Sequence, residues 1–133
     1  MRGETELSAL LRTMQPQLFA EELGYGRLPP GQGLPSGLVP FATVAEAEGM
    51  TVVAAAAELA RHGVDHVPGW ARISLTVHSD LAAVGLTAAV ATALAAEGIS
   101  ANVVAGCFHD HFLVQWDRRF AAIAVLTRLS ASA

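Results

Sequence analysis

Residues 71–104 read "ARISLTVHSDLAAVGLTAAVATALAAEGISANVV", and this stretch decides the fold. Its first part alternates as a half-buried strand does, because Ile73, Leu75 and Val77 fall on one face and polar residues fall on the other. A helix is predicted next, with one apolar stripe made of Leu86, Ala89, Val90, Ala93 and Leu94. Gly98 then ends the helix as a left-handed cap and leads into a second strand.

The C-terminal residues add one more strand and a helix. The segment "HFLVQW" (111–116) predicts a third strand, and Asp117 predicts the N-cap of a last helix. In that helix Phe120, Ile123 and Leu126 are predicted to share the apolar side. The second half of the chain therefore reads β-α-β-β-α.

The first half predicts a helix, strands and a long loop. The helix begins at Thr5 as its N-cap and stops before Pro16, with Leu7, Leu10, Leu11 and Met14 on one face. A strand is predicted over 17–28, and the Pro- and Gly-rich residues 29–37 predict a loop. Two strands that turn at Glu48-Gly49 follow, and then a short helix that ends near Gly63.

Two short segments echo each other. Residues 58–64, "ELARHGV", and residues 93–99, "ALAAEGI", are both helix ends that run through glycine into a β-branched residue. The echo predicts a structural repeat, although an alanine-rich chain produces such echoes by chance as well.

The composition argues for a globular protein and against several partners. With 53 % hydrophobic and 15 % charged residues, the chain can build a core. A net charge of -4 and the absence of a basic stripe argue against binding to nucleic acid or to an anionic membrane. The single Cys fits a reducing compartment, and residues 81–96 are too short and too rich in alanine to span a membrane. We therefore expect a cytoplasmic protein without a signal peptide.

The segment "GLTAAVATALAAEGISANVV" (85–104) resembles the signature of the ACT domain, a regulatory module that binds small molecules. Gly85-Leu86 stands at the start of the helix and Gly98-Ile99 leads into the second strand, as in that family. Residues 75–114 further resemble the C-terminal half of small bacterial proteins with two tandem ACT-like units. Two positions depart from the pattern, because the proline that often precedes the helix glycine is absent and Ser100 stands where many relatives have Asn.

The resemblance implies an α+β fold, a ferredoxin-like β-α-β-β-α-β sheet with helices on one face. It implies an N-terminal ACT-like unit over 1–68 and a C-terminal ACT unit over 69–133 that share strands. The last strand of the second unit is missing, since the tail "LTRLSASA" shows no apolar alternation. We expect a strand of the first half to complete that sheet, because an exposed unpaired edge would invite aggregation.

A ligand site is expected at the start of the helix that follows Asp80. Free backbone N–H groups and the helix dipole suit a carboxylate there, including that of an amino acid. In the family, the ligand commonly lies between the first helix of one unit and the second strand of another. The candidate residues are Asp80, Gly85, Leu86, Thr87, Ser100 and Asn102. In the alternative interpretation, Asp80 only caps the helix and the two strand residues only line an interface.

The segment "CFHDH" (107–111) is interpreted as the turn of a β-hairpin, with polar turn residues at His109 and Asp110. The alternative is a metal site of Cys107, His109 and His111 with His78 as a fourth ligand. A turn inside these five positions would separate such ligands. Sequence neighbours on a strand also rarely converge as a nucleophile and its base. We expect no catalytic residue, no metal and no cofactor.

The sequence thus predicts a non-catalytic regulatory or sensor module. It would bind an amino acid or a similar small metabolite as a homodimer, with no nucleic acid or membrane partner. The alternative is a scaffold that keeps the fold and acts only through protein contacts.

Overall fold

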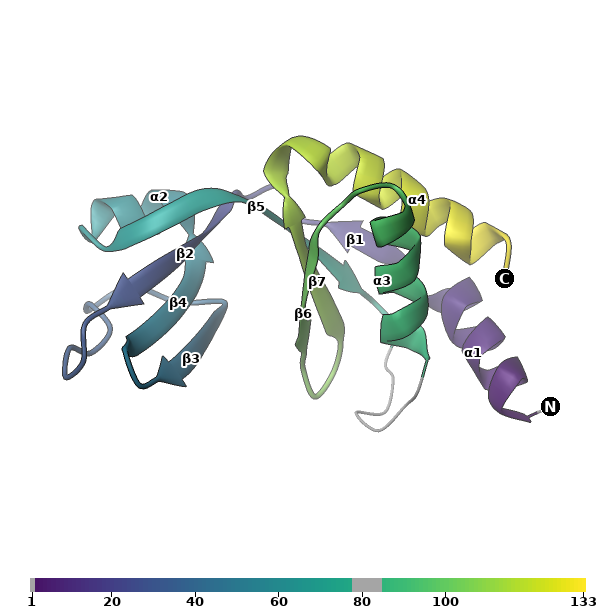
Figure 1. Ribbon diagram of the computed structural model, residues 1–133, viewed down its shortest axis with the longest axis horizontal. Helices are drawn as coiled ribbons and strands as arrows, with labels where there is room; N and C mark the ends of the chain where they lie inside the picture. The colour runs from purple at the N-terminus through teal and green to yellow at the C-terminus, as the bar shows by residue number, and fades with distance from the viewer. Residues whose placement is uncertain (1, 78–84) are drawn as a thin grey trace. The chain divides into compact units, whose positions relative to one another are not determined.

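The structure, a computed structural model, describes residues 2–77 and 85–133, and of residues 2–6 the backbone alone. In chain order the elements are α1 (Arg2–Thr13), β1 (Pro16–Leu18), β2 (Leu23–Leu28), β3 (Ala42–Glu46), β4 (Gly49–Ala55), α2 (Ala56–Arg61), β5 (Asp65–Leu75), α3 (Leu86–Ala96), β6 (Ala101–Ala105), β7 (Asp110–Gln115), the 3-10 turn η1 (Trp116–Arg118) and α4 (Arg119–Ala131) (Figure 1). Helix α1 begins before Thr5, so this residue lies inside the helix and the predicted N-cap is wrong.

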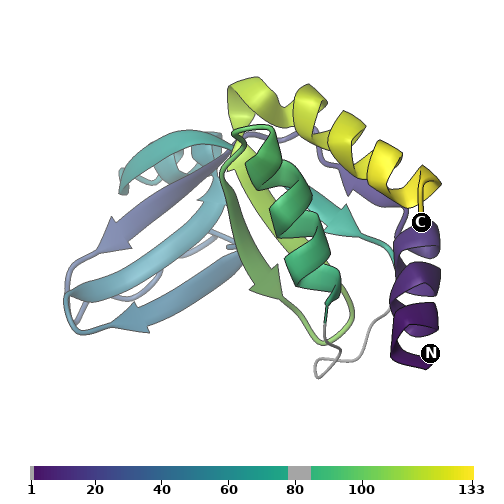
Figure 2. The same ribbon diagram turned by 45° about the vertical axis from the view of Figure 1, so that its right-hand side comes forward.

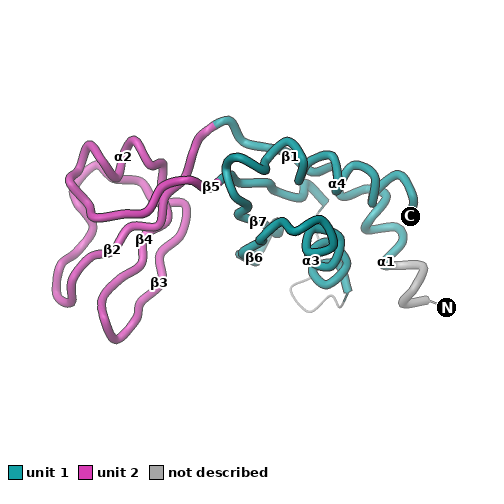
Figure 3. Tube along the Cα trace, turned by 45° about the horizontal axis from the view of Figure 1, so that its top comes forward, with its two compact units in different colours: residues 1–20, 71–133 teal, residues 21–70 magenta. Residues whose placement is uncertain are grey.

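The chain forms two compact units, which Figure 3 shows in two colours. One unit comprises residues 1–20 and 71–133, and the other comprises residues 21–70. This spatial division differs from the predicted order of repeats, because the first 20 residues pack with the C-terminal half. The boundary between residues 68 and 69 stays a prediction about the two family repeats.

In the unit of residues 21–70, the strands follow the order β3-β4-β2-β5, and each neighbouring pair is antiparallel. Helix α2 connects β4 to β5, whereas the Pro- and Gly-rich loop connects β2 to β3. This is the ferredoxin-like strand order with a loop in place of the first helix. The predicted loop is confirmed, and the predicted strand over 17–28 is split into β1 and β2.

Helix α2 packs closely on the sheet because β2 carries two glycines on the covered face. A Cβ atom at Gly26 would lie 3.0 Å from side-chain atoms of both Leu59 and Val64. The buried residues of this core are Leu28, Leu38, Val52, Ala54, Leu59 and Val64. A larger side chain at Gly26 would require the side chains of Leu59 and Val64 to shift.

Gly49 begins β4 with φ of +141°, and its backbone lies against the end of β2. A Cβ atom there would overlap the carbonyl oxygen of Leu28. Gly31 also has a positive φ, of +84°, but a Cβ atom there would meet nothing within 4 Å.

We predict that Gly49→Ala lowers the free energy of unfolding by about 2 kcal/mol or more, because strain and a backbone clash add. Gly31→Ala is the matched control, with a cost of about 1 kcal/mol from backbone strain alone. Urea denaturation of both variants measures the difference. Equal losses in the two variants would contradict the clash at Gly49.

In the other unit the strands follow the order β1-β5-β7-β6. Strand β1 is antiparallel to β5, with Pro16 opposite Leu75 and Leu18 opposite Ile73. Helix α3 connects β5 to β6, and α4 follows β7, so β1 supplies the fourth strand of a β-α-β-β-α-β sheet. The expectation that the first half completes this sheet is confirmed. Strand β5 serves both units, which confirms the sharing of strands.

Helices α1, α3 and α4 contribute to one core on one face of this sheet (Figure 2). The buried members are Leu11, Met14, Ala71, Ile73, Leu75, Leu86, Val90, Leu94, Ile99, Phe112, Val114, Ala122, Val125 and Leu126. The predicted apolar stripe of the last helix is partly wrong, because Phe120 is 65 % exposed. The chain makes a 3-10 turn before α4, so Asp117 lies in that turn instead of capping the helix, and Ala122 and Val125 face the core.

The two similar segments, residues 58–64 and 93–99, end their helices with the same type of cap. Gly63 and Gly98 have φ of +67° and +71°, and the next residue in each case donates its N–H to a carbonyl five residues earlier. These are the bonds of a Schellman cap. Helix α2 connects the third and fourth strands of its unit, whereas α3 connects the first and second strands of its unit. The two similar segments therefore occupy equivalent places in a β-α-β segment, but they do not occupy equivalent places in the two whole units.

Candidate functional site

The candidate residues at the helix start are Gly85, Leu86 and Thr87. Gly85 is the N-cap of α3 with φ of +104°, and none of the described side chains caps the helix. The first turn contains no acidic residue. Leu86 is buried in the core at 2 % exposure and Thr87 is exposed. Asp80 lies outside the described residues.

The candidate residues on the strand lie at the other end of α3. Ser100 and Asn102 are exposed where β6 begins, and the backbone N–H of Ser100 donates to Oε1 of Gln115 at 2.9 Å. The 11 residues of α3 span about 16 Å, given the rise of an α-helix. One chain therefore brings Gly85, Leu86 and Thr87 together but does not bring Ser100 and Asn102 to them (Figure 1).

The glycine at position 85 also has a packing role that the sequence did not show. A Cβ atom there would lie 3.3 Å from Cδ2 of Leu7, so α1 packs directly against the start of α3. The side chain of Leu86 points into the core, so this residue can offer a ligand only its backbone N–H. Chemically, this helix start offers N–H donors and the hydroxyl of Thr87.

The predicted β-hairpin turn is confirmed over residues 106–109, whereas Asp110 and His111 of the predicted segment lie in strand β7. The N–H of Gly106 donates to the carbonyl of His109 at 2.9 Å, and Ala105 pairs with Asp110. Cys107 is an exposed free thiol. Among the residues that the structure describes, no three His, Cys, Asp or Glu side chains lie close enough to hold a metal ion, and His78 lies outside that part of the chain.

A polar cluster lies on the sheet face opposite the helices of this unit. Ser74 is 5 % exposed, and its Oγ lies 2.6 Å from Nδ1 of His111. Nε of Arg72 donates to the same hydroxyl at 3.1 Å, and its guanidinium lies 4.1 Å over the ring of Phe19. We assign the Ser74 proton to the bond with His111, which makes that imidazole neutral with its proton on Nε2.

The Ser74–His111 pair joins two strands and does not present a nucleophile, because the hydroxyl is buried and already accepts from Arg72. Sequence alternation placed Arg72 and Ser74 on the polar face of their strand. It did not predict the contact with His111, because Ser74 and His111 are 37 residues apart in the chain and meet only when β5 and β7 lie side by side.

Burial lowers the pKa of His111, and the positive charge of Arg72 and the neighbouring His109 lower it further, against an opposing effect of Asp110. Burial also lowers the pKa of the Arg72 guanidinium. The cluster thus favours the neutral imidazole.

Because the folded-state pKa of His111 is below its ordinary value of 6.5, the unfolded chain binds this proton more readily. The stabilisation is fully present above about pH 6.5 and is lost as the pH falls toward the folded-state pKa. We predict that the melting temperature falls less between pH 7 and pH 5 in His111→Gln than in the wild type. Thermal unfolding in low-salt buffers tests this, and equal slopes in both proteins would contradict it.

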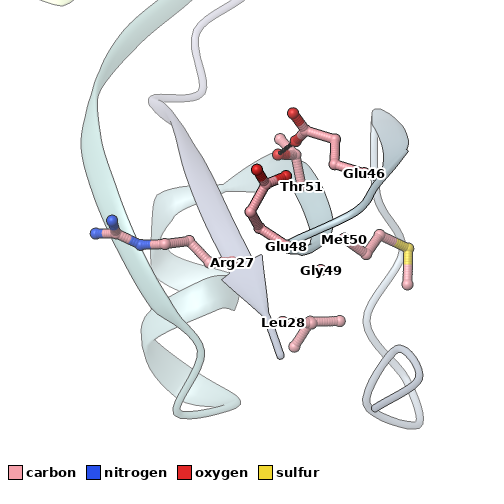
Figure 4. A pocket seen from close by; sticks show the side chains of 7 residues that line it. All are labelled: Arg27, Leu28, Glu46, Glu48, Gly49, Met50 and Thr51. Atoms are coloured by element: carbon pink, nitrogen blue, oxygen red, sulfur yellow. Dashed lines mark hydrogen bonds between the residues drawn. The ribbon is translucent and has the colours of Figure 1, made fainter. Parts of the chain in front are cut away.

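The unit of residues 21–70 carries an open hollow of about 320 Å³ (Figure 4). Its lining consists of Arg27, Leu28, Glu46, Glu48, Gly49, Met50 and Thr51. The carboxylate of Glu46 accepts a hydrogen bond from Thr51. Arg27 points away from both glutamates in Figure 4 and pairs with Asp65 at 3.1 Å. The hollow contains none of the predicted site residues.

Two sequence profiles of the ACT domain family match the chain, one over residues 2–68 and the other over residues 65–128. No curated protein matches the sequence. Within the described residues, no helix is long and apolar enough to cross a membrane.

Solved structures share the fold. A protein of unknown function from Vibrio cholerae, described as a possible transport protein, is 40% identical, with a TM-score of 0.82 over 96% of this chain and 98% of its own. A protein from Agrobacterium tumefaciens is 18% identical, with a TM-score of 0.74 over 86% of this chain and 87% of its own. The regulatory subunit of aspartate kinase from Thermus thermophilus is 12% identical, with a TM-score of 0.62 over 86% of this chain and 96% of its own.

Proposed function

Because this chain belongs to the ACT domain family, we propose that it is a regulatory module that binds an amino acid or a similar small metabolite and catalyses no reaction. The same fold occurs in the regulatory subunit of an aspartate kinase, which supports a regulatory role. We propose that the protein is cytoplasmic, because the exposed free thiol of Cys107 fits a reducing compartment.

The start of α3 is the observation that carries this proposal. Gly85 is the N-cap of α3 with φ of +104°, none of the described side chains caps the helix, and the first turn has no acidic residue. Backbone N–H groups at such a start, together with the helix dipole, attract a carboxylate. The exposed hydroxyl of Thr87 adds a donor beside them.

We propose that the remaining contacts come from another copy of the chain. Ser100 and Asn102 are exposed at the start of β6, which is the outer strand in the order of the sheet. They lie about the length of α3 away from Gly85 within one chain. A homodimer that places β6 of one copy against α3 of the other would assemble the site, and Asp80 is proposed to join it.

We predict that one amino acid raises the melting temperature of the full chain selectively. A ligand at a hundredfold its dissociation constant adds about 2.7 kcal/mol of stability, which corresponds to several degrees for a domain of this size. Asn102→Ala should remove most of this shift, measured against the melting temperature of the ligand-free variant itself. Differential scanning fluorimetry against the common amino acids measures it.

Thr43→Ala is the matched control, because Thr43 is exposed on the other outer strand, β3. It should keep the ligand-induced shift. If no amino acid stabilises the protein, or if Asn102→Ala responds as the wild type does, the ligand site is not where we propose.

The second candidate is a module that keeps the fold and acts only through protein contacts. The packing of Leu7 against Gly85 favours it, because a side chain of the protein itself already covers part of the helix start. A protein that no small metabolite stabilises would support this alternative.

A further inference from the structure

Three side chains form a stack where α4 begins. The guanidinium carbon of Arg119 lies 3.7 Å from the centre of the Trp116 ring and 4.5 Å from the centre of the Phe120 ring. Nη1 of Arg119 also donates to the carbonyl of Trp116 at 2.7 Å. Trp116 packs against the core, whereas Phe120 is 65 % exposed. The stack therefore presents a fixed guanidinium beside an open aromatic face.

Arg119 has no carboxylate partner among the described side chains. The ion pairs of that part of the chain involve Arg27, Arg61, His62 and Arg128. A guanidinium has five N–H donors in a planar fork, and two of them can bind a carboxylate at once. Because the rings and the carbonyl already hold the Arg119 side chain, little further ordering is needed when it binds.

The surrounding charge favours an anionic partner. Arg118 is the N-cap residue of α4, no side chain of the described residues caps this helix, and its first turn has no acidic residue. Arg118 donates to the main-chain carbonyl of Glu97 at 3.1 Å and also lacks a carboxylate partner among the described side chains. The segment 116–131 has three Arg and a single acidic residue, the exposed Asp117, on a chain of net charge -4. Positive charge at a helix N-terminus is unfavourable, and an anionic group relieves it.

We propose that Trp116, Arg118, Arg119 and Phe120, the α4 entry surface, bind a segment of a partner protein that presents a carboxylate side chain beside an apolar one. The guanidinium would take the carboxylate and the ring of Phe120 would cover the apolar side chain. Arginine and aromatic residues are enriched at protein interfaces, and arginine and tryptophan are among the residue types that contribute most of the binding energy there. This surface spans η1 and the first turn of α4 and does not depend on a ligand at α3.

The test uses the isotope-labelled full chain and a nine-residue peptide, Gly-Ser-Asp-Leu-Glu-Phe-Glu-Gly-Ser, followed by NMR. The indole N–H of Trp116 and the Nε–H of Arg119 should shift saturably on titration, whereas the indole of Trp70 stays unchanged as an internal control. A peptide with Asn and Gln in place of Asp and Glu should bind about tenfold more weakly, and added salt should weaken the acidic peptide.

Arg119→Gln and Phe120→Ala should each weaken the acidic peptide about tenfold. Arg61→Gln is the control, because Arg61 is an exposed arginine in the unit of residues 21–70. Melting temperatures close to that of the wild type would show that the variants fold. Equal binding of both peptides, or no shift at Trp116, would overturn the proposal. A change in the chemical shift of the Trp116 indole when the protein alone is diluted would also overturn the proposal, because a second copy of the chain would then occupy the α4 entry surface.

Discussion

The pairing of β1 with β5 is the constraint on which the unit of residues 1–20 and 71–133 depends. Without Pro16–Leu18, strand β5 would present an open edge there. The pairing continues beyond the ladder, because Phe19 donates to the carbonyl of Arg72 and Thr76 donates to that of Met14. These bonds tie the first residues of the chain to its second half and bring α1 against α3 and α4. The N-terminal residues therefore belong to the same unit as the C-terminal half of the chain, and residues 21–70 form the other unit.

Glycine is the means by which this alanine-rich chain packs its layers closely. Gly26 lets α2 approach its sheet, and Gly49 lets the β3–β4 hairpin rest on the end of β2. At Gly85 the same absence of a side chain admits Leu7 and permits the positive φ at the start of α3. Gly85 thus has a structural task in the packing of α1 against α3, whether or not a ligand binds at the start of α3.

The groups that we propose for binding are distributed over different elements of one unit. The helix start of α3 offers N–H donors, the outer strand β6 offers small polar side chains, and the entry to α4 offers arginine and aromatic rings. The polar cluster of Arg72, Ser74 and His111 holds two strands together on the sheet face opposite the helices of this unit, and its Ser74 is buried. Such a distribution suits a module that works through association, since no described pocket gathers these groups within one chain.

The sequence by itself determined the elements and their order in the second half of the chain. Alternation in residues 71–77, the apolar stripe of α3, the glycine cap at Gly98 and the turn at 106–109 are local patterns, and each depends on neighbours within a few positions. The need for a borrowed strand also followed from the sequence, once the family resemblance implied a fourth strand for this unit and the tail showed none.

Tertiary structure decided what depends on residues far apart in the chain. The contact between Ser74 and His111 depends on two strands lying side by side, and the contact between Leu7 and Gly85 depends on where β1 places the preceding helix. The exposure of Phe120 depends on a 3-10 turn that shifts which residues of α4 face the core. Local periodicity does not contain this information, because the register between distant segments is set by packing in three dimensions.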